Sequence, residues 1–422
     1  MPQRNYGAVN QAELGLSQQG PIGEEHVHAT VNVPESFTFA VPTQIVFKAG
    51  AAEGIVGEAK ALGGTRPLIV AEEGVIAAGI VGPIAKRLSD AGLDPVVFSE
   101  FSPNPHDYEC FAGLKAAGEH GADVLIAVGG GSSMDMAKAI GTLMTNGGHP
   151  VDYAGIGLIK NPLPPLIVVP TTSGTGSEVT FCYVVTDTEN RVKVNCIGPQ
   201  LAPKVALMDP LLTRTVPAGI TAATGMDAFC HAFESYTCTL ANPITEGMAL
   251  YAMELIGRYL EPAVKDGNDI EARTMLQLAS LIAGIAFTNS DCCAAHCMGE
   301  SIGGMVDMPH GVACAVFLPS VFDYNMSADP SKHARVGEIL GLDLGGLSPE
   351  EGAAKTLEHI RLWLDSLGIP HLRDIPGVDP AEFDQAAKGA LENLAAGSQP
   401  RPIDYAGYKI LFEETYAGGE GA

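Results

Sequence analysis

Short apolar runs alternate with longer amphipathic stretches along the first half of the chain. The runs are rich in Val, Ile and Leu, as in PLIVAE (67–72) and DVLIAVGG (123–130). Strands that are apolar on both faces and separated by helices are typical of a parallel sheet covered on both sides. An extended pair is expected at 37–47, further strands at 95–100, 166–170, 181–187 and 205–209, and helices at 51–62, 76–91 and 108–119.

After about residue 212 the strand signals stop and a helical period takes over. Two of these helices begin at clear capping residues, Ser348 and Asp379, each followed by a proline. Helices are expected at 218–240, 243–265, 268–289, 310–325, 349–367 and 380–397. The pattern therefore predicts a flexible tail over 1–31, an α/β domain over 32–212 and an all-α domain over 213–422.

Composition narrows the classes of protein that fit this organisation. The 422 residues include 24 Lys and Arg against 49 Asp and Glu, a net charge of −25. Such acidity disfavours binding to nucleic acid and to anionic membranes. No uninterrupted apolar run reaches the ~18 residues of a membrane span, and the N-terminus lacks the pattern of a signal peptide. With nine cysteines, an odd number, we expect reduced thiols and a cytoplasmic protein.

Two turns rich in glycine or hydroxyl groups follow predicted strands. Gly129, Gly130 and Gly131 separate a strand from a helix, and PTTSGTGSEVT (170–180) follows the strand at 166–170. Backbone amides at such a helix start suit a pyrophosphate, and hydroxyls suit phosphate or ribose. Glu72, at a strand end, could accept from ribose hydroxyls and repel a 2′-phosphate. An ordinary strand-to-helix turn, a Ser/Thr turn and a solvated Glu are the simpler alternatives, but two such loops favour a dinucleotide.

A second constellation has the residue types of a divalent-metal site. Asp227 and His231 are four residues apart on a predicted helix, so both project from one face. His296 and His310 lie in a segment that Gly303, Gly304 and Pro309 allow to fold back. Together they offer one carboxylate and three imidazoles. A buried His bonded to Asp is the simpler alternative; a cysteine-rich zinc site is another, although the chain has no CxxC pair.

With these motifs the sequence resembles the iron-containing (group III) alcohol dehydrogenase family over about 38–415. The segments that carry the resemblance are GGGSSMDMAK (129–138), PTTSGTGSEVT, the stretch 206–234, PHG (309–311) and PNP (103–105). The resemblance implies a Rossmann-like dinucleotide-binding domain, a helical metal-binding domain and an active site between them.

The resemblance also implies roles for individual residues. It implies metal ligation by Asp227, His231, His296 and His310, and a substrate pocket lined by Cys182, Phe287 and Cys292. It implies cofactor contacts from Glu72, Gly130, Gly131, Ser132, Asp135, Thr171, Thr172, Thr175 and Lys193. Because Glu72 matches the acid that disfavours NADP in the family, NAD(H) is the expected cofactor.

One position departs from the family pattern. Where the family often has a second His four residues after the one matching His296, this chain has Glu300. A changed polar residue in the pocket is the mild interpretation. The sharper hypotheses are that Glu300 serves a proton relay or binds a polar group of the substrate.

The expected reaction is the reversible, metal-dependent oxidation of a small primary alcohol or diol to its aldehyde. The resemblance favours Fe²⁺, while Zn²⁺ or Mn²⁺ also suits the ligands, and a homodimer or higher homo-oligomer is expected. A dehydroquinate-synthase-like lyase is one alternative, although residues 287–310 lack the Lys or Arg that an anionic substrate requires. A scaffold role through the tail 1–31 is another.

Overall fold

The apolar runs of the first half form a six-stranded parallel sheet in the computed structural model, which describes residues 34–418. The strand order is β1-β9-β6-β4-β2-β3. In the register of the sheet, Leu68 of β2 lies opposite Leu125 of β4 on one side and Val96 of β3 on the other. The strands are β1 (Gln44–Phe47), β2 (Pro67–Val70), β3 (Val96–Phe98), β4 (Val124–Gly129), β6 (Leu166–Pro170) and β9 (Val205–Met208). The predicted α/β fold class with a parallel sheet is confirmed.

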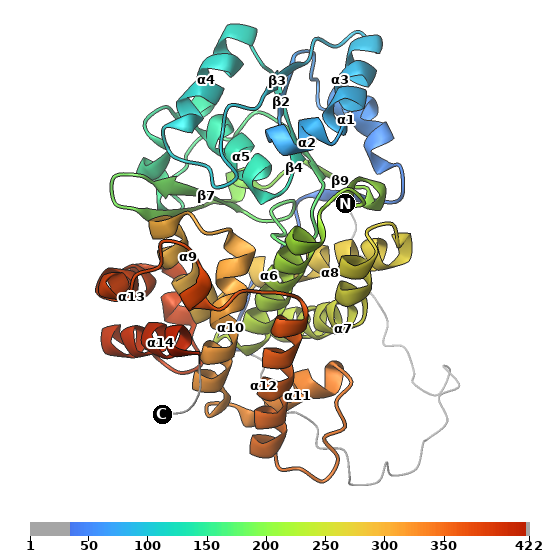
Figure 1. Ribbon diagram of the computed structural model, residues 1–422. Coiled ribbons are helices and arrows are strands. Elements are labelled where there is room, and N and C mark those ends of the chain that lie inside the picture. Colours follow the sequence, from blue (N-terminus) through green and yellow to red (C-terminus); the bar gives the residue numbers. More distant parts are fainter. Residues whose placement is uncertain (1–33, 419–422) are drawn as a thin grey trace, which may run out of the picture. The chain divides into compact units, whose positions relative to one another are not determined.

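Alternate residues of each strand point into two different apolar layers. Leu68 of β2 packs with residues of α4 and α5, whereas its neighbour Ile69 packs with residues of α1 and α3. Since side chains alternate across a strand, a sheet with helices on both faces needs apolar residues at every position. Figure 1 shows α4 and α5 on one side of the sheet and α1 and α3 on the other. The bounds are α1 (Ile55–Ala61), α3 (Val81–Asp90), α4 (Glu109–His120) and α5 (Gly131–Asn146).

The order of the strands reverses between β2 and β4. From β2 the chain proceeds to β3 at one edge, whereas from β4 it proceeds through β6 and β9 toward the other. The crevice beyond the carboxyl ends of strands at such a point is the usual ligand site of an open α/β sheet. Glu72 follows β2 and Gly129 ends β4. The topology therefore brings the predicted ribose acceptor and the predicted pyrophosphate turn to one crevice.

A small second sheet lies outside the pattern that the sequence indicates. β7 (Cys182–Asp187) pairs antiparallel with β8 (Val192–Ile197), and β5 (Gly155–Ile156) pairs parallel with β8. The strand predicted at 181–187 is therefore correct in place, but it belongs to this second sheet. β8 was not expected because Lys193 and Asn195 interrupt its apolar run.

Two expected elements differ for identifiable reasons. Of the extended pair at 37–47, only β1 forms a strand, paired with β9. The single helix expected at 76–91 is two helices, α2 (Glu73–Ala77) and α3. Gly79 separates them with φ of +77°, a left-handed conformation that a helix cannot contain.

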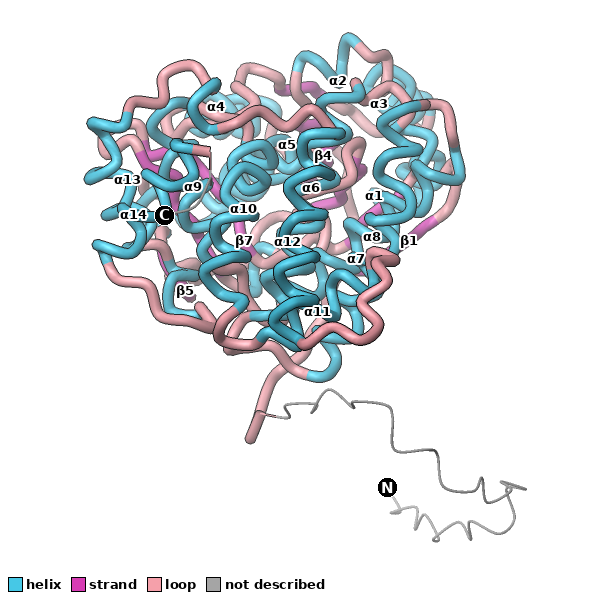
Figure 2. The backbone as a smooth tube through the Cα atoms, turned by 60° about the horizontal axis from the view of Figure 1, so that its bottom comes forward, coloured by secondary structure: helices cyan, strands magenta, loops and turns pink. Residues whose placement is uncertain are grey.

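The second half is helical, with α6 running through its middle against α7, α8 and α10 (Figure 2). Three helices were not expected, α9, α11 and α14, and the helix expected at 380–397 shortens to α13. All described strands precede residue 212, while the domain boundary itself stays a prediction. The helices are α6 (Ala218–Thr237), α7 (Pro243–Lys265), α8 (Ile270–Thr288), α9 (Ala294–Val306), α10 (His310–Met326), α11 (Pro330–Ile339), α12 (Pro349–Ser366), α13 (Phe383–Glu392) and α14 (Tyr405–Ala417).

One described helix, α8, is long and apolar enough to cross a membrane by length and composition alone. Most of its apolar window is buried against the rest of the chain, and Leu276 and Ala279 belong to the same apolar cluster as α6 and α7. The core helix of a soluble protein passes the same test, so this is weak evidence for a membrane span. The tail predicted over 1–31 lies outside the described residues.

His333 of α11 is a buried histidine inside this helical packing. The edges of Phe233 and Phe322 meet its ring at centroid distances of 5.5 and 4.6 Å. Its Nδ1 donates to the carbonyl of Asp329 over 2.8 Å, while its buried Nε2 has no partner among residues 34–418. Because burial penalises the charged ring, the pKa of His333 falls from 6.5 to about 4.

Replacing His333 by Phe should therefore change how stability depends on pH. The unfolded chain takes up the proton first, so wild-type stability is complete above pH 6.5 and is lost as the pH falls toward 4. Across that window the wild type should lose about 3 kcal/mol relative to His333→Phe. Urea unfolding of both proteins at several pH values measures this difference. The exposed His371 provides the control, since His371→Gln should leave the pH dependence unchanged. Parallel curves for wild type and His333→Phe would contradict the assignment.

Candidate metal centre and cofactor cleft

The helix α6 carries two of the predicted ligands on one face. Asp227 and His231 lie one turn apart and are only 1% and 4% exposed. Nearly every residue of α6 from Thr221 onward is buried, so these polar side chains do not reach the bulk solvent. A carboxylate at such a place requires a partner that compensates its lost hydration.

The other two ligands come from the helices on either side of a tight turn. His296 lies on the first turn of α9, and His310 is the first residue of α10. α9 ends at Val306, and the next residue, Asp307, has φ of +52°, a left-handed conformation that Asp adopts more readily than most residues. The fold-back that the sequence predicts between the two histidines is therefore present. Gly304 lets α9 approach β8, since a Cβ there would lie 2.8 Å from the Cα of Val192.

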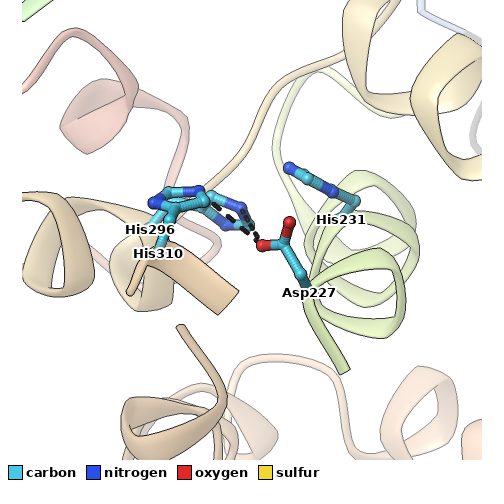
Figure 3. A group of neighbouring side chains, drawn as sticks. All are labelled: Asp227, His231, His296 and His310. Atoms are coloured by element: carbon cyan, nitrogen blue, oxygen red, sulfur yellow. Dashed lines mark ion pairs between the residues drawn. The ribbon is translucent and has the colours of Figure 1, made fainter. Parts of the chain in front are cut away.

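The four side chains converge on one point (Figure 3). Asp227 Oδ1 lies 3.8 Å from His296 Nε2 and 3.6 Å from His310 Nε2, and one atom from each of the four residues lies within 4.8 Å of the others. Ligands about 2.1 Å from a tetrahedral ion would be about 3.4 Å apart. The distances therefore fit a single cation.

Unpaired polar atoms support the same conclusion. In the described part of the chain, each of the four residues has a buried oxygen or nitrogen without a hydrogen-bond partner: Asp227 Oδ1, His231 Nδ1, His296 Nε2 and, for His310, Nδ1, since its Nε2 lies near the thiol of Cys314. Buried polar atoms are rarely left unpaired in proteins. A cation at their centre would satisfy at least one atom of each side chain, so the donor set fits a divalent metal.

Burial sets the charge state of these groups. It raises the pKa of Asp227 to about 6 and lowers the pKa values of His231 and His310 well below 6.5. Two of the histidines are thus neutral, which is the form that binds metal. For His296, burial alone would lower the pKa, but the carboxylate of Glu234 outweighs it and raises the pKa to about 9.

Glu234 is a site residue that the sequence analysis missed. It lies on α6 one turn after His231 and is fully buried. Its Oε1 accepts the amide of Ala295 over 2.7 Å, and its Oε2 pairs with Nδ1 of His296. This bond leaves Nε2 of His296 facing Asp227. The sequence carries a signal for Glu234 in HAFE (231–234), where an acid follows a histidine by one helical turn. Its partner, His296, lies 62 residues away in the sequence.

The two predicted loops meet beside the reversal of strand order. A Cβ at Gly130 would lie 3.2 Å from Thr172 Oγ1, and one at Gly131 would lie 2.8 Å from the methyl group of Thr175. The glycines therefore let the second loop pack directly against the start of α5. Glu72 accepts a bond of 3.4 Å from the hydroxyl of Ser133 in the first turn of α5.

Asp135 and Lys138 hold the second loop in place through hydrogen bonds. Asp135 accepts the hydroxyl of Ser177 over 2.8 Å and the amide of Val184 over 3.2 Å. Lys138, fully buried, donates to the carbonyls of Ser177 and Cys182, each over 2.8 Å. The structure thus gives Asp135 a supporting part in the loop, while its cofactor contact stays a prediction. The position of Lys138 in the first motif gave no sign of this role.

One cleft of about 900 Å³ joins the loops to the metal centre. Phe287 forms part of its wall and stacks on His231 with the ring centroids 4.2 Å apart. Lys193 lines it as well, with its Nζ bonded to Asn104 Oδ1 over 2.8 Å. The predicted site residues that line this cleft are Glu72, Gly130, Gly131, Ser132, Asp135, Thr171, Thr172, Thr175, Cys182, Lys193, Asp227, His231, Phe287, Cys292, His296, Glu300 and His310.

Two family models together match most of the chain. A model described as iron-containing alcohol dehydrogenase matches residues 42–210, and a model for the C-terminal part of the Fe-containing alcohol dehydrogenase family matches residues 221–416. The chain belongs to the iron-containing alcohol dehydrogenase family. The resemblance carried by the sequence motifs is confirmed, and the chain is an oxidoreductase of the alcohol dehydrogenase type.

Individual relatives agree with the family. The 1,3-propanediol dehydrogenase of Citrobacter freundii is 42% identical over 369 residues, which are 86% of this chain and 95% of that protein. The NAD-dependent methanol dehydrogenase of Bacillus methanolicus is 36% identical, over 86% of this chain and 95% of its own length. A solved alcohol dehydrogenase from Oenococcus oeni superposes with a TM-score of 0.87 at 38% identity, covering 90% of this chain and all of that structure.

For this iron-containing alcohol dehydrogenase, Glu234→Gln should weaken metal binding. The amide offers one acceptor oxygen where the carboxylate offers two, so His296 loses its fixed orientation. Loss of such a supporting carboxylate typically costs about 10- to 100-fold in metal affinity. Competition with a chromogenic chelator measures the dissociation constant.

The matched control is Glu246→Gln, which removes a partly buried acid of α7 that pairs with Lys332 and not with the metal centre. Its metal affinity should equal that of the wild type. An unchanged metal affinity in Glu234→Gln, together with reduced stability to urea, would assign Glu234 to packing alone.

Proposed function

We propose that this chain catalyses the reversible oxidation of a small primary alcohol to its aldehyde with NAD⁺ and a bound divalent metal. The observation that carries the proposal is the convergence of Asp227, His231, His296 and His310 in the same cleft as the two loops at the reversal of strand order. A metal-ligand set beside a dinucleotide crevice provides the two parts that hydride transfer from an alcohol requires.

The ligand set would hold the metal through one carboxylate and three imidazoles. When bound, a divalent cation supplies a Lewis acid that favours ionisation of an alcohol near neutral pH. Glu234 keeps His296 oriented for this purpose, and Phe287 covers one side of His231. We propose Fe²⁺ because the family is iron-containing, although Zn²⁺ and Mn²⁺ suit the same donors.

The loops would hold the dinucleotide at the other end of the cleft. The amides at the start of α5 suit its pyrophosphate, and the hydroxyls of Thr171, Thr172 and Thr175 suit its phosphates and ribose. When bound, NAD⁺ supplies the acceptor of the hydride. Cys182 and Phe287 line the same cleft.

The alternative functions gain no support from the cleft. A dehydroquinate-synthase-like lyase needs several cations for its anionic substrate, and Lys193 is the single Lys or Arg among the described residues that line the cleft. A scaffold role of 1–31 concerns residues outside the described part. We also propose, from the sequence alone, a cytoplasmic homodimer or higher homo-oligomer whose partner molecules are small alcohols and aldehydes.

The central test combines metal analysis with a turnover assay. Protein purified without oxygen should contain about one metal per chain and should oxidise NADH when a small aldehyde is added. His296→Ala should lower turnover by at least about 10²- to 10³-fold, the usual cost of losing charge stabilisation at a reacting oxygen. The dissociation constant of NADH, measured by fluorescence, should stay within about 3-fold of the wild type. Bound metal without any NAD(H)- or NADP(H)-coupled reaction would reject the dehydrogenase proposal.

Glu72 provides a test of the cofactor preference. The carboxylate lies at the end of β2 beside the start of α5 and would repel a 2′-phosphate on the ribose. Glu72→Ser should therefore improve kcat/KM for NADP⁺ by about 10-fold or more, the effect of removing one close like charge. The neighbouring Glu73→Ser, in the first turn of α2, is the control and should leave the ratio of NAD⁺ to NADP⁺ use unchanged. If the ratio of NAD⁺ to NADP⁺ use is the same in Glu72→Ser and Glu73→Ser, Glu72 has no role in cofactor selection.

A further inference from the structure

Glu300 is a buried carboxylate with one oxygen held by the protein and the other oxygen free. It lies on α9 one turn after His296, is 6% exposed and lines the cleft. Its Oε2 accepts two amide groups, Nδ2 of Asn195 over 2.7 Å and Nδ2 of Asn393 over 2.5 Å. Within residues 34–418 no group donates to Oε1, and this atom is not among the fully buried ones. Oε1 therefore presents an open acceptor to the cleft.

The surrounding bonds keep this arrangement fixed. Oδ1 of Asn393 accepts the amide of Ala395 over 3.0 Å, so the nitrogen of that side chain must face Glu300. Asn195 comes from β8, on a segment far from Asn393 in the sequence. Two donors from different parts of the chain thus hold one carboxylate oxygen. Because an amide donor cannot pass a proton onward, these contacts suit a binding role of Glu300 better than a proton relay.

The charge of this part of the cleft favours a neutral ligand. Lys193 lies on β8 two residues before Asn195 and is buried. Burial lowers its pKa, and Glu300 is the acid that most strongly opposes this shift. Lys193 and Glu300 line the same cleft with opposite formal charges, so neither a cationic nor an anionic alcohol finds a site of a single sign there. A neutral molecule with a hydroxyl donor avoids both penalties.

The spacing limits the length of such a molecule. His296 and Glu300 are four residues apart on one helix, which places their Cβ atoms about 6 Å apart. Because the ligand and the acceptor lie one helical turn apart, a short diol is the substrate that we expect to place one oxygen at the metal centre and a second hydroxyl near Oε1. A simple alkyl alcohol would leave this acceptor to water.

We infer that Glu300 determines substrate specificity by accepting a hydrogen bond from the second hydroxyl of a short diol, or of the corresponding hydroxyaldehyde. The contact involves no covalent change; it positions the substrate while the alcohol at its other end reacts. This inference rests on the proposed alcohol dehydrogenase function and goes beyond it by naming the substrate class and the residue that selects it.

The test compares 1,3-propanediol with 1-propanol, which differ only in the second hydroxyl. For the metal-loaded wild type, kcat/KM should favour the diol by about 10- to 100-fold, the range expected for a hydrogen bond to a charged acceptor. Glu300→Gln keeps the two amide contacts but turns the free acceptor into a donor, and Glu300→Met removes it. Both variants should lose most of the diol preference, which is measured as the ratio of kcat/KM for the two alcohols.

The neighbouring Ser301→Ala is the matched control. Ser301 lies on the same helix but bonds the carbonyl of Ala386, and it does not line the cleft. This variant should keep the diol preference. Bound metal is measured in every variant, so that a disrupted ligand set is recognised.

Several outcomes would overturn the inference. A wild type that uses both alcohols equally, or that prefers a quaternary ammonium alcohol to the diol, excludes selection of a neutral hydroxyl. Equal losses for both alcohols in the Glu300 variants, with a shifted pH–rate profile, would assign a proton relay instead. If the wild type oxidises no alcohol, the proposed function fails. The binding of both alcohols to the metal-loaded enzyme–NADH complex, measured by calorimetry, then decides whether Glu300 still selects the diol.

Discussion

The burial of charged and polar side chains along one face of α6 is the constraint on which this structure depends. Asp227, His231 and Glu234 all project from this helix and are at most 4% exposed. Glu234 is compensated by α9, through the amide of Ala295 and the ring of His296. Within residues 34–418, Asp227 Oδ1 and His296 Nε2 have no hydrogen-bond partner, whereas His310 Nε2 lies 3.7 Å from the thiol of Cys314. A cation at this centre would compensate the unpaired atoms and would couple metal affinity to the arrangement of α6, α9 and α10.

The cofactor end of the cleft is organised by a different mechanism. Here the order of parallel strands opens a crevice, and Lys138 holds the loop after β6 through several of its carbonyl and hydroxyl oxygens. Gly130 and Gly131 are needed because this loop packs where their side chains would be. The glycine motif therefore has two roles, since the same residues allow the loop to pack closely and leave backbone amides available for a ligand.

Local patterns predicted much of this structure, and contacts distant in sequence explain the rest. Strands with two apolar faces indicated the parallel sheet, and the four-residue spacing of Asp227 and His231 indicated one half of the metal centre. β8 was missed because Lys193 and Asn195 interrupt its apolar run, and α11 is more polar than the core helices. Glu234 and Asn393 could not be assigned because their partners, His296 and Glu300, lie 62 and 93 residues away.

The departure at Glu300 shows how one residue can change a pocket without changing the fold. A neutral imidazole offers a single acceptor nitrogen, so a His at this position could satisfy only one of the amides of Asn195 and Asn393. A carboxylate accepts both amides at one oxygen and still has a second oxygen for a ligand. In the proposed function, the metal centre would hold one end of the substrate. The selectivity for the other end would then depend on a group one helical turn away, which can vary independently of the metal ligands.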